Sequence, residues 1–272
     1  ITLTMLCELL PFSAFAQSDI GQELALAVAQ SLEEENGEAI AGGKCGENLT
    51  WSLSNDWTLT IRGTGKMYNY NSQKLNYQPP WYRYSNYIRA VILKPGITYI
   101  GSDAFANSSI ISVEIPDTVT SIGDPDSIRS GVFSGCIYLK SVSIPDSVTS
   151  IGSDAFSYCT SLTSITIPDS VTTIGHAAFY KCTSLTSATL LGAVTSIDGS
   201  TFNFCSSLAS VTLPDSITSI KGYAFSSCTS LQDVYYQGSQ EQWASILVDE
   251  GNDALKNATI HYNSGKEDPD PN

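Results

Sequence analysis

Cysteine recurs at a fixed interval of 23 residues through the second half of the chain. Phenylalanine keeps the same interval three residues ahead of each cysteine, and isoleucine forms a third series ahead of the phenylalanines. A fixed interval shared by three residue types predicts a solenoid, in which equivalent residues of successive repeats stack into columns. The three series are Cys136, Cys159, Cys182, Cys205 and Cys228; Phe133, Phe156, Phe179, Phe202 and Phe225; and Ile151, Ile174, Ile197 and Ile220, with Ile100 and Ile122 upstream of the regular interval.

One unit, residues 161–183, shows the expected structure of a repeat. Apolar and polar residues alternate over 162–167, which predicts a strand that Pro168 ends. A second, shorter extended piece follows at 171–174. Apolar residues then recur at helical spacing over 178–182, which predicts one helical turn with an apolar inner side. Aligning all units on the phenylalanines gives six repeats, beginning near Val91, with a parallel sheet on one face of a curved right-handed solenoid and short extended or helical turns on the other.

The segments on either side of the repeats predict two end caps. Residues 44–67 alternate around Ser54-Asn55-Asp56, which indicates a β-hairpin. Near the other end, Ser239 and Gln242 resemble a capping box before a short helix, and a last strand follows at 258–262. The expected organisation is a signal peptide truncated at its start (1–16), a spacer (17–43), an aromatic β-rich cap (44–90), six repeats (91–236), an α/β cap (237–263) and a Pro/Asp linker (264–272).

The N-terminal segment and the overall charge limit location and partners. Residues 1–16 end in Ala14-Phe15-Ala16, which is typical of a secretory signal peptide, although Cys7 leaves a lipoprotein anchor as an alternative. The segment is too short and interrupted for a stable transmembrane helix, so no membrane insertion of the mature chain is expected. A formal net charge of -14 argues against a nucleic-acid partner, because phosphate binding needs clusters of Lys and Arg.

The cysteine series invites three interpretations: disulfides, a zinc site or buried free thiols. Side chains at equivalent positions of stacked repeats point in parallel, whereas a disulfide needs converging Cβ vectors. Four zinc ligands must surround one point, and a row cannot do so. We therefore expect free, buried thiols that act as small hydrophobic groups.

Nothing in the sequence indicates catalysis, a cofactor or a metal centre. The only histidines, His176 and His261, lie at unrelated positions, and nucleophile elbows, phosphate loops and zinc spacings are absent from the sequence. Aspartates follow the strand-ending prolines and allow two interpretations, a calcium-binding column or side chains that, with the adjacent serines, satisfy turn amides. We favour the second. These aspartates are Asp117, Asp146, Asp169 and Asp215.

The repeats carry a family resemblance. Residues 144–175, IPDSVTSIGSDAFSYCTSLTSITIPDSVTTIG, are similar to the BspA-like class of leucine-rich repeats, and the likeness covers about 90–236. CGENLTWSLSNDWTLTIRGTGKM resembles the N-terminal cap of such proteins, and VYYQGSQEQWASI resembles their C-terminal cap. The resemblance implies an α/β-type leucine-rich-repeat solenoid from a bacterium, secreted or held at the cell surface, with adhesive roles reported for some members. Two departures from the consensus are six extra residues within 123–131 and Leu191-Gly192 in place of Pro-Asp.

Two surfaces are candidates for binding. The first is the outward face of the repeat strands, where a solenoid commonly binds partners: Glu114, Ser141, Ser143, Ser164, Thr166, Ser187, Thr189, Ser210, Thr212 and Tyr235. The second is an aromatic site in the cap, which is either a carbohydrate platform or a plug over the solenoid end, the interpretation we favour: Tyr70, Trp81, Tyr82 and Tyr84.

These features lead to one expected function and two alternatives. The expected function is adhesion, in which the solenoid binds an extracellular or host-surface protein. The alternatives are a structural or targeting spacer for a further C-terminal domain, and glycan binding through the aromatic cap.

Overall fold

The computed structural model describes residues 39–127 and 131–264. The predicted signal peptide, most of the predicted spacer and all but the first residue of the predicted linker lie outside the described residues. So do three residues of the irregular 123–131 segment.

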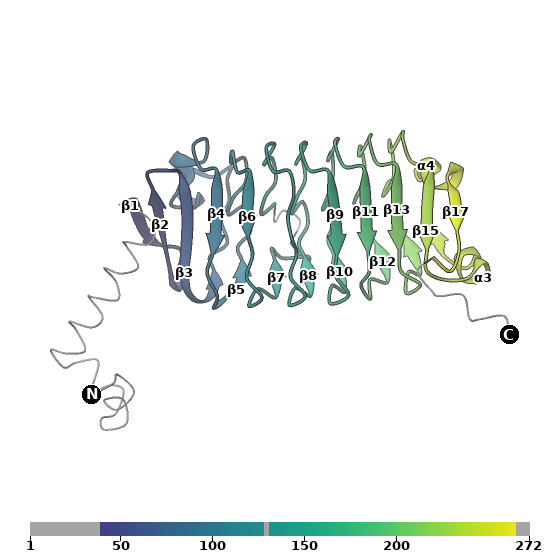
Figure 1. Ribbon diagram of the computed structural model, residues 1–272, viewed down its shortest axis with the longest axis horizontal. Helices are drawn as coiled ribbons and strands as arrows, with labels where there is room; N and C mark the ends of the chain where they lie inside the picture. Colours follow the sequence, from purple (N-terminus) through teal and green to yellow (C-terminus); the bar gives the residue numbers. More distant parts are fainter. Residues whose placement is uncertain (1–38, 128–130, 265–272) are drawn as a thin grey trace, which may run out of the picture.

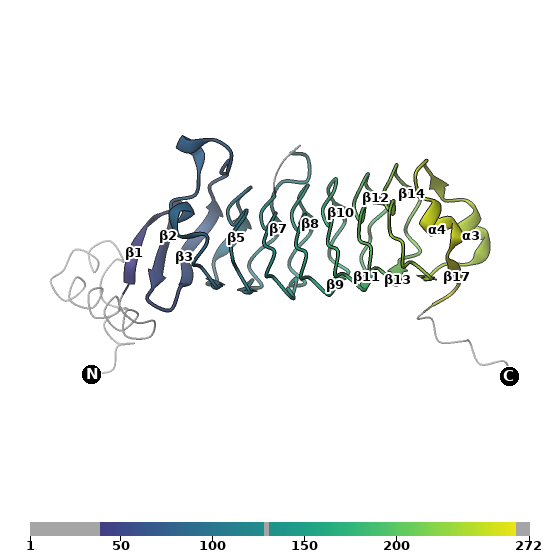
Figure 2. The ribbon, with the colours of Figure 1, turned by 90° about the horizontal axis from the view of Figure 1, so that it is seen from above.

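The described chain is an elongated stack of repeats with a cap at each end (Figure 1). All repeats but one contribute a strand to a series of mostly longer parallel strands, the face ladder, and each repeat contributes a strand to a second ladder (Figures 1 and 2). The parallel solenoid predicted from the sequence is therefore confirmed. The face ladder contains β4 (Ala90–Leu93), β6 (Ser112–Glu114), β9 (Ser164–Ile167), β11 (Ser187–Leu190), β13 (Ser210–Leu213), β15 (Asp233–Tyr236) and β17 (Thr259–His261). The second ladder contains β5 (Ile97–Ile100), β7 (Ser121–Ile122), β8 (Ser150–Ile151), β10 (Thr173–Ile174), β12 (Ser196–Ile197), β14 (Ser219–Ile220) and β16 (Leu247–Val248).

One long strand of the N-terminal cap starts both ladders. The predicted hairpin is present as β2 (Gly46–Ser54) and β3 (Thr58–Met67), and β1 (Ala39–Lys44) extends it into residues that we had assigned to the spacer. The first half of β3 pairs with β4 and its second half with β5. Gly63 lies between the two halves with φ +116°, where a Cβ atom would collide with the Asn48 carbonyl. This bend allows one strand to cover two ladders.

Aromatic rings fill the centre of the stack. The indole of Trp81, in the cap, packs on Phe105 with 5.6 Å between ring centroids, and each following phenylalanine stacks on the one before it at 5.3–5.4 Å. All of these side chains are buried. Centroid distances of this size suit offset-stacked rings, which add attraction beyond the burial of apolar area. The phenylalanine series of the sequence is thus one continuous column.

The cysteines form a second column and make a bond that the sequence did not reveal. All six described cysteines are free and buried, as predicted for the five of the 23-residue series. Each thiol of the 23-residue series donates a hydrogen bond to the phenylalanine carbonyl of the preceding repeat at 3.1–3.2 Å, for example Cys182 Sγ to Phe156 O. In the first repeat Ser108 occupies the cysteine position, and its buried hydroxyl has no partner among the described residues. The thiols therefore connect successive repeats as well as filling space.

The turns that carry the phenylalanines are not helical, so the predicted helical turn is wrong. In five of the six repeats two turn residues, such as Ala177 and Lys181, have φ between +54° and +61°. A left-handed residue cannot continue a right-handed helix, and the backbone instead closes a succession of tight turns. Amides of these turns donate to the next repeat, as Phe179 N does to Thr201 O at 2.9 Å. We call this side of the solenoid the turn edge.

The two irregular repeats of the sequence coincide with breaks in the ladders. The face ladder stops between β6 and β9, where residues 141–144, after the six-residue insertion, pair with neither strand. The second ladder stops between β10 and β12, beside Leu191-Gly192. In regular repeats a serine after the Pro-Asp pair donates to the preceding repeat, as Ser170 Oγ does to Val148 O at 2.7 Å. Ala193 occupies this position and cannot donate a hydrogen bond to Val171 O.

The C-terminal cap supplies one strand to each ladder and contains two short helices. The predicted capping box is present in α3 (Gln240–Ala244), but the helix ends before Leu247, which belongs to β16. Helix α4 (Asp253–Asn257) was not predicted, and 3-10 turns at Leu75–Tyr77 and Tyr82–Tyr84 complete the helical elements of the described chain.

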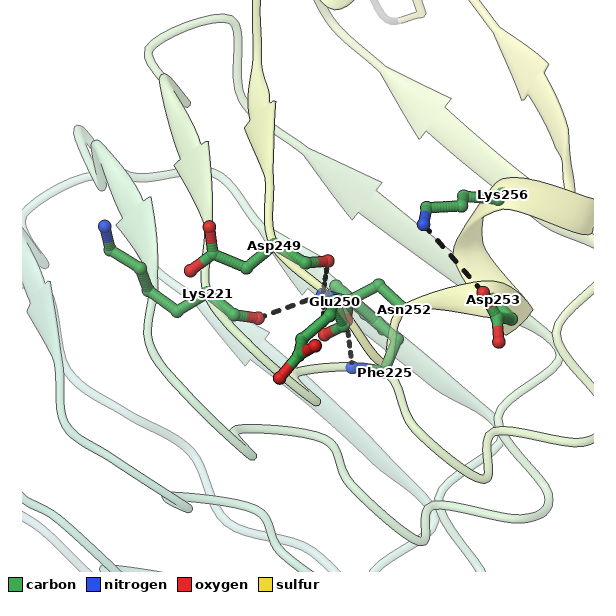
Figure 3. A network of polar contacts seen from close by, with 7 residues as sticks. All are labelled: Lys221, Phe225, Asp249, Glu250, Asn252, Asp253 and Lys256. Carbon is green, nitrogen blue, oxygen red and sulfur yellow. Dashed lines mark hydrogen bonds and ion pairs between the residues drawn. The ribbon is translucent and has the colours of Figure 1, made fainter.

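Within this cap, the Asn252 side chain pairs with backbone groups of the last repeat. In the preceding repeats the phenylalanine amide donates to a carbonyl of the next repeat, but after Phe225 no further repeat follows. The Asn252 side chain takes that place: its Oδ1 accepts from Phe225 N at 2.9 Å, and its Nδ2 donates to Lys221 O and Asp249 O, each at 3.0 Å (Figure 3). Because Asn252 is completely buried, water cannot replace these bonds.

Replacing Asn252 is therefore expected to destabilise the whole array. We expect Asn252→Ala to lower the free energy of unfolding by roughly 2–4 kcal/mol, because it leaves buried backbone groups without partners. Asn252→Asp keeps the acceptor for Phe225 N but loses both donors, so its cost should be similar. Urea unfolding followed by circular dichroism measures both. Asn257→Ala, at an exposed position of α4, is the control; an Asn252→Ala value equal to the control would contradict the capping role.

The thiols are expected to be protected and to make stability sensitive to alkaline pH. Burial raises the pKa of Cys182 and Cys136 from 9.0 to about 12. Unfolded thiols lose protons above about pH 9 while folded ones do not, so the free energy of unfolding should fall as pH rises from about 9 to 12. Urea unfolding at pH 8–11 tests this, and Cys182→Ala should show a shallower decline. At pH 8.5 the six described thiols should alkylate only in denaturant; disulfide-linked peptides containing Cys159 and Cys182 would contradict the free-thiol column.

The break in the second ladder should be partly repairable. We expect Ala193→Ser to stabilise the protein by about 0.5–1 kcal/mol, because the new hydroxyl can donate to Val171 O. The matched change in the regular repeat, Ser216→Ala, removes a 2.8 Å bond to Val194 O and should cost about 1 kcal/mol. Differential scanning calorimetry compares both with the unaltered chain. A higher melting temperature for Ala193→Ser and a lower one for Ser216→Ala would support the predicted hydrogen bond to Val171 O. A lower melting temperature for Ala193→Ser would contradict it.

Candidate interaction surfaces

The face ladder arranges the predicted face residues in two parallel rows. Register pairs Ser164, Ser187, Ser210 and Asp233 in one row, and Thr166, Thr189, Thr212 and Tyr235 in the other. Their side chains point outward because the alternate strand positions, such as Ile165 and Ile167, are buried in the core. The predicted residues from Ser164 to Tyr235 therefore lie on one surface. Glu114, Ser141 and Ser143 are also exposed, beyond or within the break in the ladder.

The break in the face ladder produces a hollow of about 590 Å³ on this surface. Its lining includes Ser141, Ser143, Ser164 and Thr166, together with Asp146 and Asp169. Residues 141–144 make no backbone pairing with β6 or β9, so their amide and carbonyl groups are open to another partner. The hollow thus combines hydroxyls, carboxylates and unpaired main chain.

The C-terminal end of the face carries a cluster that the sequence analysis missed. His261 lies beside Tyr235 in register, and their rings stack with 4.7 Å between centroids. His261 Nε2 also lies 2.7 Å from Asp233 Oδ1. Asp233 stands 23 residues after Ser210 but was not among the predicted face residues. His261 belongs to the cap, where the interval no longer applies. Tyrosine and histidine here supply the aromatic surface that the rest of the face lacks.

The aspartates that follow the strand-ending prolines lie at the surface of the described chain. Asp117, Asp146 and Asp169 are exposed, and within 39–127 and 131–264 no three acidic, cysteine or histidine side chains come together as metal ligands. The adjacent serines do not satisfy amides of their own turn, as we had interpreted them. Instead, they donate to carbonyls of the preceding repeat, as Ser147 Oγ does to Val119 O at 2.7 Å.

The aromatic residues of the cap act mainly as a plug. Trp81 is completely buried, its Nε1 donates to Ala104 O at 2.8 Å, and Tyr70 and Trp51 contact it edge-on. No carbohydrate can stack on a buried ring, so Trp81 cannot take part in the carbohydrate platform that the sequence allowed as an alternative. Tyr82 is exposed, while Tyr84 is half-buried with the Arg83 guanidinium over its ring at 4.9 Å.

A row of exposed and half-buried aromatic side chains follows the turn edge and was also missed. Tyr158, Tyr180 and Phe204 come from three successive repeats, and the Lys181 ammonium lies within 5.0–5.5 Å of all three ring centroids. Tyr158 and Phe204 are each 43% exposed. Their backbones are left-handed, which turns these side chains away from the core. Residues at such positions do not follow helical or strand spacing, so periodicity did not single them out.

Comparison with known proteins identifies the family. A family model for the BspA type leucine rich repeat region matches six copies over residues 67–125 and 126–246. The chain is a BspA-type leucine-rich repeat protein. A comparison with curated proteins finds no match. Among the helices of the part that the structure describes, none is long and apolar enough to cross a membrane.

Solved structures similar to this BspA-type protein are bacterial. The leucine-rich repeat protein of T. pallidum is 22% identical, with a TM-score of 0.50 over 80% of this chain and 97% of that one. The Bacteroides ovatus leucine-rich repeat protein is 21% identical, with a TM-score of 0.49 over 81% of this chain and 71% of that one. A leucine rich cell surface protein of Faecalibacterium prausnitzii is 19% identical, with a TM-score of 0.29 over 79% and 99%. BspA-type repeat proteins are typically found at the cell surface.

Proposed function

We propose that this BspA-type protein is a secreted or surface-held adhesion module that binds an extracellular protein through the face ladder and does not act as an enzyme. One observation carries the proposal: the face presents two aligned rows of hydroxyls, interrupted by a hollow whose main chain is unpaired. Extended concave or flat strand surfaces are the usual binding surfaces of solenoids. The family's cell-surface location and the signal-like sequence of residues 1–16 support placement outside the cell.

The chemistry of the face favours a polar, extended partner segment. Serine and threonine hydroxyls both donate and accept, so they can satisfy a partner's amides and carbonyls in either strand direction. At the hollow, the free backbone of 141–144 offers main-chain hydrogen bonds of the kind used when a peptide joins a sheet. The Tyr235–His261 pair supplies an aromatic anchor at the far end, where interfaces commonly gain much of their affinity.

Binding to immobilised extracellular-matrix proteins tests this proposal. The full chain should bind at least one of fibronectin, laminin, fibrinogen or collagen saturably in surface plasmon resonance. Thr166→Lys places a bulky charge in the hollow, and Tyr235→Ala removes the anchor; each should weaken binding about tenfold or more. Thr173→Lys is the matched control, since Thr173 is an exposed strand threonine of the same repeat but lies in the second ladder. Absence of saturable binding to any of these proteins, or equal loss with Thr173→Lys, would contradict the proposal.

A further inference from the structure

A second hollow, of about 580 Å³, lies between the N-terminal cap and the turn edge. The cap contributes the loop 70–73, and three successive repeats contribute the rest. This volume falls within the range of small-molecule sites, which is roughly 300–1,000 Å³. None of its lining residues belongs to the face ladder.

The hollow exists because the middle of the three repeats lacks side chains where its neighbours have them. Asp103 and Asn107 occupy the two turn positions of the first repeat, and Asp154 and Tyr158 occupy those of the third. In the repeat between them the same positions are Gly131 and Gly135. Gly135 has φ +73°, and a Cβ atom there would lie 2.4 Å from Asn107 Oδ1. The glycines form a floor of bare main chain between two polar walls.

The side chains around this floor are held in place by the protein. The Asp103 carboxylate accepts from both the amide and the hydroxyl of Ser72, each at 3.0 Å, which ties the cap loop to the wall. Ser134 Oγ lies 2.7 Å from Ser157 Oγ. The Tyr158 ring contacts Tyr180 and lies 5.0 Å from the Lys181 ammonium. A ligand would therefore meet groups whose conformational freedom is already reduced.

The residue types that line the hollow favour some chemical classes of ligand over others. It contains carboxylates, amides and hydroxyls, two tyrosine rings and one small apolar side chain, Ala106. Among the described residues that line it there is no lysine or arginine, so at those residues a phosphate, sulfate or carboxylate ligand would meet negative charge without a counter-ion. The described lining also lacks the apolar surface that buries an amphipathic helix or a lipid chain. Adjacent hydroxyls of a sugar match carboxylate and amide side chains, and the C–H face of its ring packs on tyrosine.

We propose that this hollow, which we call the glycine-floored groove, binds an uncharged oligosaccharide. Asp103, Asn107 and Ser134 form hydrogen bonds with its hydroxyls, and Tyr158 packs against one sugar ring at the open end. The proposal is independent of protein binding at the face ladder, because the two sites share no residues. It also differs from the carbohydrate platform that the sequence allowed as an alternative, which comprised Tyr70, Trp81, Tyr82 and Tyr84; of these, only Tyr70 lines the groove.

Isothermal titration calorimetry and a glycan array with the full chain test the proposal. The probes are neutral oligosaccharides, namely cellotetraose, mannotetraose, lacto-N-tetraose and chitotetraose, with sialyllactose and a sulfated disaccharide as charged comparisons. At least one neutral probe should bind, and the charged probes should not. Tyr158→Ala should weaken that binding about tenfold or more, whereas Tyr158→Phe, which keeps the ring, should retain most of it.

Phe204→Ala is the matched control. Phe204 occupies the same turn position two repeats further on, has the same 43% exposure and a similar left-handed backbone, but lies outside the groove. Its replacement should leave sugar binding unchanged. The proposal is overturned if no neutral probe binds, if charged probes bind better, or if Phe204→Ala weakens binding as much as Tyr158→Ala. Thr166→Lys, which blocks the face ladder, should leave sugar binding intact, so the failure of one site is distinguishable from failure of the other.

Discussion

The solenoid depends on the contacts that the core phenylalanine of each repeat makes with the neighbouring repeats. Its amide donates to a carbonyl of the following repeat, and its carbonyl accepts a hydrogen bond from the cysteine thiol of the following repeat. Its ring stacks on the phenylalanine rings of both neighbouring repeats. Each of these interactions requires an adjacent repeat. A single repeat would bury too little apolar surface and leave too many backbone groups unpaired to fold alone. The ends of the array must therefore supply substitutes, and they do: Trp81 continues the rings at one end, and the Asn252 amide replaces a backbone carbonyl at the other.

Regular features of this structure were predictable because they obey an interval. Periodicity located the strands, the ring column and the buried thiols, and local signals located the hairpin and the capping box at Ser239. The left-handed turn residues could not be predicted, since tyrosine, lysine and phenylalanine have no intrinsic preference for that backbone and adopt it only because stacking imposes it. Asn252 also escaped notice, because an asparagine that completes a distant backbone ladder looks in sequence like any loop asparagine.

The surfaces were harder to predict than the core. The sequence identified the hydroxyl rows, because outward strand positions follow the same interval as inward ones. The sequence could not show that hollows would form at the irregular repeats. The six-residue insertion and the glycines Gly131 and Gly135 create a hollow only because the adjacent repeats have side chains on either side. Trp81 was easier to interpret: the aromatic cluster in the cap allowed a binding platform or a plug, and the favoured plug agrees with the burial of this large ring over the end of the core. Both hollows lie at repeats whose sequence or strand pairing departs from that of the regular repeats.

The positions of the two ladder breaks have a mechanical consequence. The face ladder is interrupted between β6 and β9 and the second ladder between β10 and β12, so the breaks fall in different repeats. At each break the other ladder is intact, and the ring column runs through both. A pulling force applied along the long axis, as on a tethered protein in flowing liquid, therefore finds no cross-section at which both ladders are open. Such an array resists separation into two halves while still offering irregular surface at two places along its length.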